Sequence, residues 1–172
     1  MASLQKHLNP DTMEINFRKT VHQDDVDIIR GICTSTGFFR EDETKVAVEL
    51  IQEALLKDQD ASGYHFIMME HEGATCGFVC YGPTPCTEGT FDLYWIVVDN
   101  NYRGKGLGIL LLKQTEQELM QIHARKLYIE TSSTDKYLPT RKFYEKAGYA
   151  EEARLKDYYL EGDDKVIYVK DL

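Results

Sequence analysis

A strand, a glycine-rich turn and a helix follow one another in the middle of the chain. Residues 91–98 are apolar almost throughout and rich in aromatic and β-branched side chains, a pattern typical of a central strand covered on both faces. Gly104, Gly106 and Gly108 follow, and apolar residues then recur at helical spacing as far as Ile122. A strand joined in this way to an amphipathic helix predicts an α/β fold, with the helix packed on a sheet.

The remaining hydrophobic patterns complete that fold. We expect further strands over residues 14–19, 64–70, 76–81, 126–131, 149–159 and 165–170, and further helices over residues 24–32, 44–57 and 139–146. Glu72-Gly73 is typical of a tight hairpin turn, and the final hairpin is expected to turn near residues 162–164. The predicted order is β-α-α-β-β-β-α-β-α-β-β.

Length and composition narrow the class of protein. The 172 residues suit a single domain over residues 1–172, in which we expect residues 1–12 to be flexible. A net charge of −9 argues against a nucleic-acid partner, because neutralising phosphates requires a concentrated basic surface. No secretory signal is expected, and no apolar run reaches the roughly 20 residues that span a bilayer. We therefore expect a cytoplasmic protein without a membrane partner, as a monomer or homodimer.

Four cysteines, Cys33, Cys76, Cys80 and Cys86, occur without a C-x-x-C pair. Because Cys80 stands inside an apolar run, we interpret the group as buried free thiols in a reducing compartment and not as a zinc site. His65, His71 and His123 are scattered along the chain. No metal is expected.

The glycine turn has the features of an anion site. Glycines let a backbone approach a ligand closely, and the first N–H groups of the following helix face outward, where the helix dipole favours an anion. A pyrophosphate is the natural occupant, with Arg103 and Lys105 as cations at its rim. A P-loop would require Gly-Lys-Ser/Thr, and a dinucleotide fold would require glycine where Ile109 stands. A flexible loop before an ordinary helix is the remaining alternative.

Two segments resemble a known family. Arg103-Gly104-Lys105-Gly106-Leu107-Gly108 resembles the R/Q-x-x-G-x-G/A signature of the GNAT superfamily of N-acetyltransferases, and the segment from Phe143 to Tyr149 is similar to its F-Y-E-x-x-G-F/Y segment. The resemblance extends from Glu14 to the C-terminus. It implies a single-domain GNAT fold, with a mixed, mostly antiparallel sheet whose central strands splay apart and are flanked by helices. It also implies acetyl-CoA as co-substrate, with its pantetheine arm between the splayed strands.

The resemblance assigns the cofactor contacts residue by residue. Backbone groups of three strand residues should pair with the pantetheine, and backbone N–H groups of the glycine turn should hold the pyrophosphate. Two residues where the fifth strand ends should flank the arm, and two basic residues are candidate contacts for the nucleotide. The strand residues are Ile96, Val97 and Val98, and the residues of the glycine turn are Arg103, Gly104, Lys105, Gly106, Leu107 and Gly108. The residues at the end of the fifth strand are Thr131 and Ser132, and the two basic residues are Arg141 and Lys146. Tyr137 and Thr140 depart from the Asn and Ala that many members carry there.

Acyl transfer to an amine requires a base for the amine and a proton for the departing thiolate. Tyr144 matches a tyrosine that family members often use to protonate the sulfur, and a phenol with a pKa of about 10 keeps its proton at neutral pH. Asp92 matches the place where some members carry a catalytic Glu, so it is the candidate base, directly or through a water. Structural alternatives are a packed aromatic ring for Tyr144 and a solvated acid for Asp92. Tyr94 and Glu130 rank second.

The sequence thus predicts an N-acetyltransferase, an acyltransferase that acts by direct attack of a primary amine in a ternary complex. The acceptor is expected to contact the first two helices, the loop through Phe38 and Phe39, and the final hairpin, whose aromatic and acidic residues suggest a rim that attracts cations. A small amine and a protein or peptide amine both fit. The alternatives are a CoA-binding sensor without catalysis and an acyltransferase for longer chains.

Overall fold

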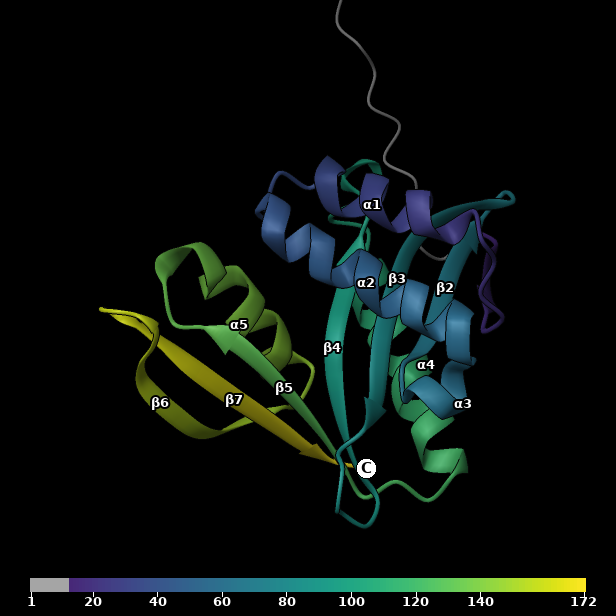
Figure 1. Cartoon of the computed structure of the whole chain (residues 1–172). Helices are drawn as coiled ribbons and strands as arrows, with labels where there is room; N and C mark the ends of the chain where they lie inside the picture. The colour runs from purple at the N-terminus through teal and green to yellow at the C-terminus, as the bar shows by residue number, and fades with distance from the viewer. Residues whose placement is uncertain (1–12) are drawn as a thin grey trace, which may run out of the picture. The chain divides into compact units, whose positions relative to one another are not determined.

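The computed structural model describes residues 13–172, and the segment expected to be flexible, residues 1–12, lies outside the described residues. The described chain contains a seven-stranded open sheet flanked by helices, with the hydrogen-bonded strand order β1-β2-β3-β4-β5-β7-β6 (Figure 1). The pairs β1–β2, β5–β7 and β6–β7 are antiparallel, whereas β4 and β5 run parallel. The predicted α/β class with a mixed sheet is confirmed.

The elements follow the predicted order, with their ends shifted by no more than three residues. The strands are β1 (Ile15–Arg18), β2 (His65–His71), β3 (Ala74–Pro83), β4 (Thr90–Val98), β5 (Lys126–Ser132), β6 (Ala150–Leu160) and β7 (Asp163–Asp171). The helices are α1 (Asp25–Ser35), α2 (Glu41–Lys57), α3 (Gln59–Ser62), α4 (Leu107–Gln121) and α5 (Leu138–Lys146), with 3-10 turns η2 (Asn100–Tyr102) and η3 (Asp135–Tyr137).

The sequence patterns missed α3, which is a single turn of helix. Its start is capped by Asp58, whose carboxylate accepts a hydrogen bond from the backbone N–H of Ala61 at 2.8 Å. Aspartate is a strong capping residue, so this signal was present in the sequence. Four residues, however, are too few to show a helical hydrophobic period.

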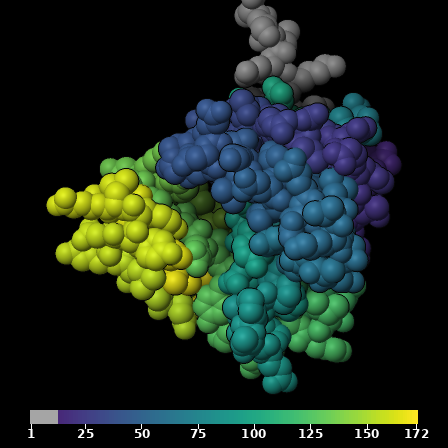
Figure 2. Space-filling view, viewed as in Figure 1, coloured from purple at the N-terminus to yellow at the C-terminus, as the bar shows by residue number. Residues whose placement is uncertain are grey.

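The described chain divides into two compact units, residues 13–79 with 96–112, and residues 80–95 with 113–172. In the first unit, α1 and α2 lie in front of β2 and β3, and α4 begins behind them (Figure 1). Four consecutive residues of β2, Phe66 to Met69, are therefore buried on both faces of the sheet. The side chains of α1 and α2 form the purple and blue surface of this unit (Figure 2).

The expectation that residues 91–98 are covered on both faces was wrong. In β4 only Leu93 and Val97 are buried, and Tyr94 is 38% exposed. The strands that carry two-sided burial are β2 and β3. The apolar run therefore identified a strand correctly. The burial of that strand depends on which helices cover the sheet, and the sequence of the strand does not show this.

An ion pair network anchors α1 to the sheet of the first unit. Asp25 is 1% exposed and accepts two hydrogen bonds of 2.9 Å from the guanidinium of Arg18, which also donates to Glu70 at 2.7 Å. The carboxylate accepts a third bond from the backbone N–H of His22 at 2.7 Å. A buried carboxylate is stable only when its oxygens are paired in this way.

In the second unit, α5 and the later part of α4 pack on one face of the β5–β7–β6 sheet. The ring of Tyr168 on β7 lies 6.0 Å from the ring of Tyr144 on α5. Glu116 of α4 accepts a hydrogen bond from Lys170 of β7 at 2.8 Å. Since side chains alternate along a strand, the opposite face of this sheet carries the intervening residues, among them Lys165 and Ile167.

Candidate functional site

The carboxylate of Asp99 makes two of the hydrogen bonds that hold the turn between β4 and α4. Its Oδ1 accepts the backbone N–H of Asn101 at 2.9 Å and so caps the 3-10 turn η2. Its Oδ2 lies 3.1 Å from the hydroxyl of Ser35 at the end of α1, and that hydroxyl in turn accepts the N–H of Asn100 at 3.2 Å. The segment that precedes the glycine turn is therefore held by hydrogen bonds within η2 and to the end of α1.

Two of the three glycines of the turn adopt a conformation that favours glycine. Gly104 and Gly106 both have φ of 75°, in the left-handed region. The carbonyl of Gly106 accepts the N–H of Leu110 at 3.2 Å, the first bond of α4. The N–H groups of Leu107, Gly108 and Ile109 precede this first bond of the helix. The helix dipole attracts an anion to this end of α4.

The two basic side chains of the turn are placed differently. Arg103 is exposed. The ammonium of Lys105 donates to the carbonyl of Asn101 at 3.1 Å and lies 5.0 Å from the centre of the Tyr102 ring. Lys105 therefore stabilises the turn from within, while Arg103 extends into solvent, where it is available to a ligand.

At the end of β4 the backbone comes unusually close to β3. A Cβ atom built on Gly77 would lie 2.8 Å from the carbonyl oxygen of Val97 and 3.4 Å from the Cα of Val98. Asp99, the next residue, donates its N–H to the carbonyl of Cys76 at 2.9 Å. Ile96, Val97 and Val98, the residues expected to pair with pantetheine, thus lie on a strand whose position depends on a glycine opposite.

The parallel pairing of β4 with β5 is short. Its register runs from Thr90–Lys126 to Leu93–Ile129, although β4 continues to Val98 and β5 to Ser132. Asp92, the candidate base, lies within the paired part, opposite Tyr128. Its carboxylate is half-buried and accepts a hydrogen bond from the hydroxyl of Thr84 at 2.7 Å.

A polar network fixes the end of β5. Thr131 and Ser132 are both buried, and the hydroxyl of Ser132 donates to the buried carboxylate of Asp163 at 2.6 Å. Arg141 of α5 donates to the carbonyls of Ser132 and Thr134 at 2.8 and 2.9 Å. These bonds give Arg141 a part in holding the strand end, whereas Lys146, the other candidate nucleotide contact, is exposed at the end of α5.

Three tyrosines of the second unit form one cluster. The ring of Tyr144 lies 6.1 Å from that of Tyr149 and 6.0 Å from that of Tyr168. The hydroxyl of Tyr149 donates to Glu116 at 2.9 Å and that of Tyr168 to Glu145 at 3.0 Å. No described residue hydrogen-bonds the hydroxyl of Tyr144. Burial raises the pKa of Tyr144, so this hydroxyl carries a proton at neutral pH that no neighbour already accepts.

The cysteines are protonated thiols in the interior, with one exception. Cys33, Cys76 and Cys80 are buried, and burial raises the pKa of Cys33 to about 12 and that of Cys76 to about 11. Cys86 is exposed, so its predicted burial was wrong: it lies in the connection between β3 and β4, after the apolar run has ended. Thiols with such pKa values are poor nucleophiles at neutral pH.

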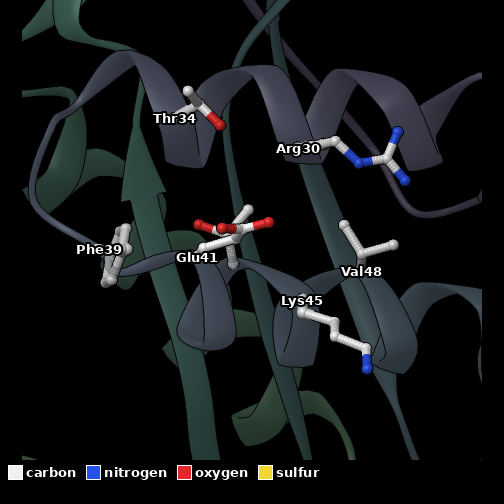
Figure 3. Close-up of a pocket in the computed structure, with 7 residues that line it drawn as sticks. Arg30, Thr34, Phe39, Glu41, Lys45 and Val48 are labelled. Atoms are coloured by element: carbon white, nitrogen blue, oxygen red, sulfur yellow. The ribbon is translucent and has the colours of Figure 1, made fainter.

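A pocket of about 500 Å³ lies on the first unit (Figure 3). Figure 3 shows Arg30 and Thr34 projecting from α1, and Glu41, Lys45 and Val48 from α2, with Phe39 on the connecting loop. Helices α1 and α2 and the loop through Phe39 were the elements expected to contact an acceptor. Arg30 and Lys45 have acidic partners on their own helices, Asp27 and Glu49.

Sequence reasoning missed several residues that shape these sites. Asp99 directly follows a strand and precedes two asparagines, a pattern typical of a side-chain-capped turn, and this signal was available. Gly77 and Thr84 act through contacts that strand pairing creates, and nothing in their own neighbourhood signals a role. Asp163 was expected only as an acidic residue of the final hairpin, and its bond to Ser132 was not foreseen. Over residues 13–172, no group of three His, Cys, Asp or Glu side chains is arranged to hold a metal ion, and no helix there is long and apolar enough to cross a bilayer.

Comparison with known proteins gives a consistent result. A model of the Acetyltransferase (GNAT) family matches residues 29–149. A GNAT-family acetyltransferase structure from Desulfovibrio desulfuricans is 44% identical, with a TM-score of 0.89, over 92% of this chain and 99% of that chain. The ribosomal-protein-S18-alanine N-acetyltransferase of Escherichia coli is 18% identical, with a TM-score of 0.72, over 92% of this chain and 94% of that one, a likeness of fold.

A curated relative matches over a shorter stretch. N-alpha-acetyltransferase 30 of Xenopus laevis is 35% identical over 69 residues, which make up 40% of this chain and 24% of that protein. The chain therefore spans about a quarter of the length of this relative.

Proposed function

The chain belongs to the Acetyltransferase (GNAT) family, and on this premise we propose that it transfers an acetyl group from acetyl-CoA to a primary amine by direct attack in a ternary complex. The observation that carries the proposal is the glycine turn. Its left-handed Gly104 and Gly106 lead into the first turn of α4, whose N–H groups suit the pyrophosphate of CoA. Arg103, exposed beside the turn, would add a cationic contact.

The proposed pantetheine contacts are backbone groups of Ile96 to Val98. A strand that continues beyond its pairing with β5 supports this, because its backbone groups there can bind an extended ligand as another strand would. The residues that end β5, Thr131 and Ser132, are proposed to flank the arm. Lys146 remains a candidate contact for the nucleotide. Arg141 can have this role only through the guanidinium N–H groups that do not bond Ser132 or Thr134.

We propose Tyr144 as the acid that protonates the departing CoA thiolate. Its proton is retained at neutral pH, and no described residue accepts it, which distinguishes Tyr144 from Tyr149 and Tyr168 in the same cluster. Asp92 is the proposed base, directly or through a water, with its carboxylate oriented by Thr84. Glu130 is the second candidate base.

Direct transfer is favoured over an acyl-cysteine intermediate. The three interior thiols have raised pKa values, so the thiolate that such an intermediate requires is scarce at neutral pH. An α-amine, with a pKa of about 7.7–8.0, needs less help from a base than a lysine side chain at about 10.4. The similarity to N-alpha-acetyltransferase 30 makes peptide α-amines the first acceptors to test, followed by small amines.

Calorimetry with acetyl-CoA, propionyl-CoA and free CoA tests the cofactor, and thiol release across peptides and small amines tests the reaction. We expect acetyl-CoA to bind and at least one amine to release CoA. Binding without thiol release from any amine would favour a CoA sensor, and faster turnover with propionyl-CoA would favour a longer acyl chain. Absence of binding by all three would refute the proposal.

Tyr144→Phe tests the acid, and Tyr168→Phe is its matched control. Tyr144→Phe removes a hydroxyl without a partner, so we expect kcat to fall about 100-fold, with an unchanged dissociation constant for acetyl-CoA. Tyr168→Phe removes a hydroxyl from the same cluster that is bonded to Glu145, so it should lower stability and leave kcat nearly unchanged. A kcat for Tyr144→Phe equal to that of the wild type would exclude Tyr144 from the mechanism.

A further inference from the structure

Lys165, near the start of β7, has its ammonium enclosed between an acid and an aromatic ring. Its Nζ lies 2.6 Å from the carboxylate of Glu130 on β5 and 4.1 Å from the centre of the Tyr158 ring on β6. The Lys165 side chain is only 11% exposed, although Glu130 is 50% and Tyr158 54% exposed. The two partners thus face solvent while the cation fills the space between them.

Lys165 keeps its charge in this position. Burial acts to lower the pKa of the ammonium, but hydrogen bonds to Glu130 and Tyr158 outweigh it, and the pKa lies above its ordinary value. A carboxylate and an aromatic face are also the two groups that proteins use to bind a ligand ammonium. The ammonium of Lys165 therefore stands where these two groups could otherwise bind the ammonium of a ligand.

This group lies on the face of the sheet that α5 does not cover. The register pairs Glu130 with Ile167 and Ser132 with Lys165, so Glu130 and Lys165 project to the same side. The opposite side carries Tyr168, which contacts Tyr144 of α5, and Lys170, which contacts Glu116 of α4. The residues of β6 and β7 form part of the surface, shown in yellow in Figure 2.

Other acids of the final hairpin also have partners within the chain. Asp163 is buried against the hydroxyl of Ser132, and Asp164 accepts the backbone N–H of Asp157 at 2.9 Å and lies 3.5 Å from the guanidinium of Arg154. Of these two acids, Asp164 therefore has a cationic partner within the chain, whereas Asp163 is hydrogen-bonded by neutral groups. The aromatic residues of the hairpin, Tyr158 and Tyr159, remain exposed.

We propose that Lys165 is a specificity-determining residue, which selects acceptor amines that carry no second positive charge near the reacting nitrogen. This inference rests on the proposed function and names the substrate class of the same reaction. Lys165 fills the position between Glu130 and Tyr158 that a second ammonium of the acceptor would take, and it repels a cation that approaches from solvent. Monoamines and peptides with an uncharged first residue are then substrates, whereas polyamines and peptides with a cationic first residue are discriminated against.

The test compares acceptors that differ by one trimethylammonium group, which carries a fixed positive charge. One pair is a peptide beginning with norleucine and the same peptide beginning with trimethyllysine. The other is hexylamine and (6-aminohexyl)trimethylammonium. Each molecule offers one reactive amine, because the trimethylated nitrogen cannot be acetylated. The readout is the ratio of kcat/KM for the charged acceptor to that for the neutral one.

For the wild type we expect a ratio below one. Lys165→Met, which keeps the length of the apolar stem, should raise the ratio about tenfold, and Lys165→Arg should leave it near the wild-type value. The matched control is Lys156→Met on the same hairpin, which makes the same change in net charge at a side chain that is 86% exposed. Its ratio should stay within about twofold of the wild type.

Three results would overturn the inference. The first is a wild-type preference for the charged acceptor, a result that needs no variant to fold. The second is a ratio in Lys165→Met that moves no more than in Lys156→Met, with both proteins shown to be folded by circular dichroism. In these two cases the protein is active, so the proposed acetyltransferase function stands. The third, no transfer to either pair or to any other amine by the wild type, would refute both proposals.

Discussion

Gly77→Ala is the substitution whose effect follows most directly from the structure. The new methyl group would lie 2.8 Å from the carbonyl oxygen of Val97 and 2.9 Å from Cε of Met69. The end of the Met69 side chain can turn away. The carbonyl cannot, because Asp99, two residues further along, is hydrogen-bonded back to Cys76 on β3. Alanine therefore requires β3 and β4 to move apart beside Gly77.

The expected cost is about 1–2 kcal/mol. Overpacking a close-packed interior typically costs about 1–3 kcal/mol, and the smaller conformational entropy of the unfolded alanine chain offsets roughly 0.4–1 kcal/mol of this. For a protein of this size, a loss of 1 kcal/mol lowers Tm by about 2–4 °C, so Gly77→Ala should unfold roughly 2–8 °C below the wild type.

Gly31→Ala is the matched control, since it makes the same chemical change within the same unit. Gly31 lies inside α1, and a Cβ atom there would meet nothing within 4 Å. Alanine is favoured over glycine in a helix interior by about 0.8–1 kcal/mol, so this variant should unfold about 2–4 °C above the wild type. The two substitutions therefore have opposite expected signs.

Differential scanning calorimetry of the three proteins at neutral pH measures both shifts. Calorimetric titration with acetyl-CoA adds a functional readout, because Ile96 to Val98 are the proposed pantetheine contacts: binding should weaken in Gly77→Ala and be unchanged in Gly31→Ala. A Tm for Gly77→Ala equal to or above that of the wild type would refute the reasoning, and so would shifts of the same sign in both variants.

Two further predictions concern charged residues of the first unit. Burial acts to raise the pKa of Asp25, but the hydrogen bonds from Arg18 and His22 outweigh it and hold the pKa below its ordinary value. The stability that the ionised Asp25 contributes to the folded state is therefore present above pH ~4 and is lost as the pH falls through the folded-state pKa. Asp25→Asn should therefore cost about 1.5–3 kcal/mol in urea unfolding at pH 7 and less at pH 4, and an equal cost at both pH values would contradict this assignment. Asp99→Ala removes the side-chain cap that precedes the glycine turn, and such a cap contributes about 0.5–2 kcal/mol. Steady-state kinetics should therefore show the KM for acetyl-CoA raised about 2–30-fold, with kcat nearly constant. An unchanged KM would mean that the turn does not depend on Asp99.

The elements and the glycine turn could be predicted from the sequence because their signals are local. The glycine turn was recognised from Gly104, Gly106 and Gly108, and two of these, Gly104 and Gly106, have φ of 75°. The strands and the longer helices each contain enough residues to show a period. The same locality explains what was missed, since α3 is too short for a period and the burial of β4 depends on elements distant in sequence.

The partners of individual side chains could not be predicted. Arg141 was assigned to the nucleotide, but its guanidinium bonds the carbonyls of Ser132 and Thr134, at the end of the preceding strand. Ser132 in turn bonds Asp163, which lies 31 residues away in the sequence. The contact between Ser132 and Asp163 follows from the register of β5 with β7, and a one-residue change of that register would direct the side chain of Asp163 to the other face.

Charge illustrates the difference between composition and structure most clearly. The aromatic and acidic residues of the final hairpin suggested an attraction for cationic acceptors. Charges further apart than about 8 Å are largely screened at physiological ionic strength, so an acceptor responds mainly to the nearest charges. On the face of β5 and β7 that α5 does not cover, Glu130 and Lys165 are paired at 2.6 Å. We therefore expect the acceptor preference to depend on the pairing of Glu130 with Lys165, which the net charge does not reveal.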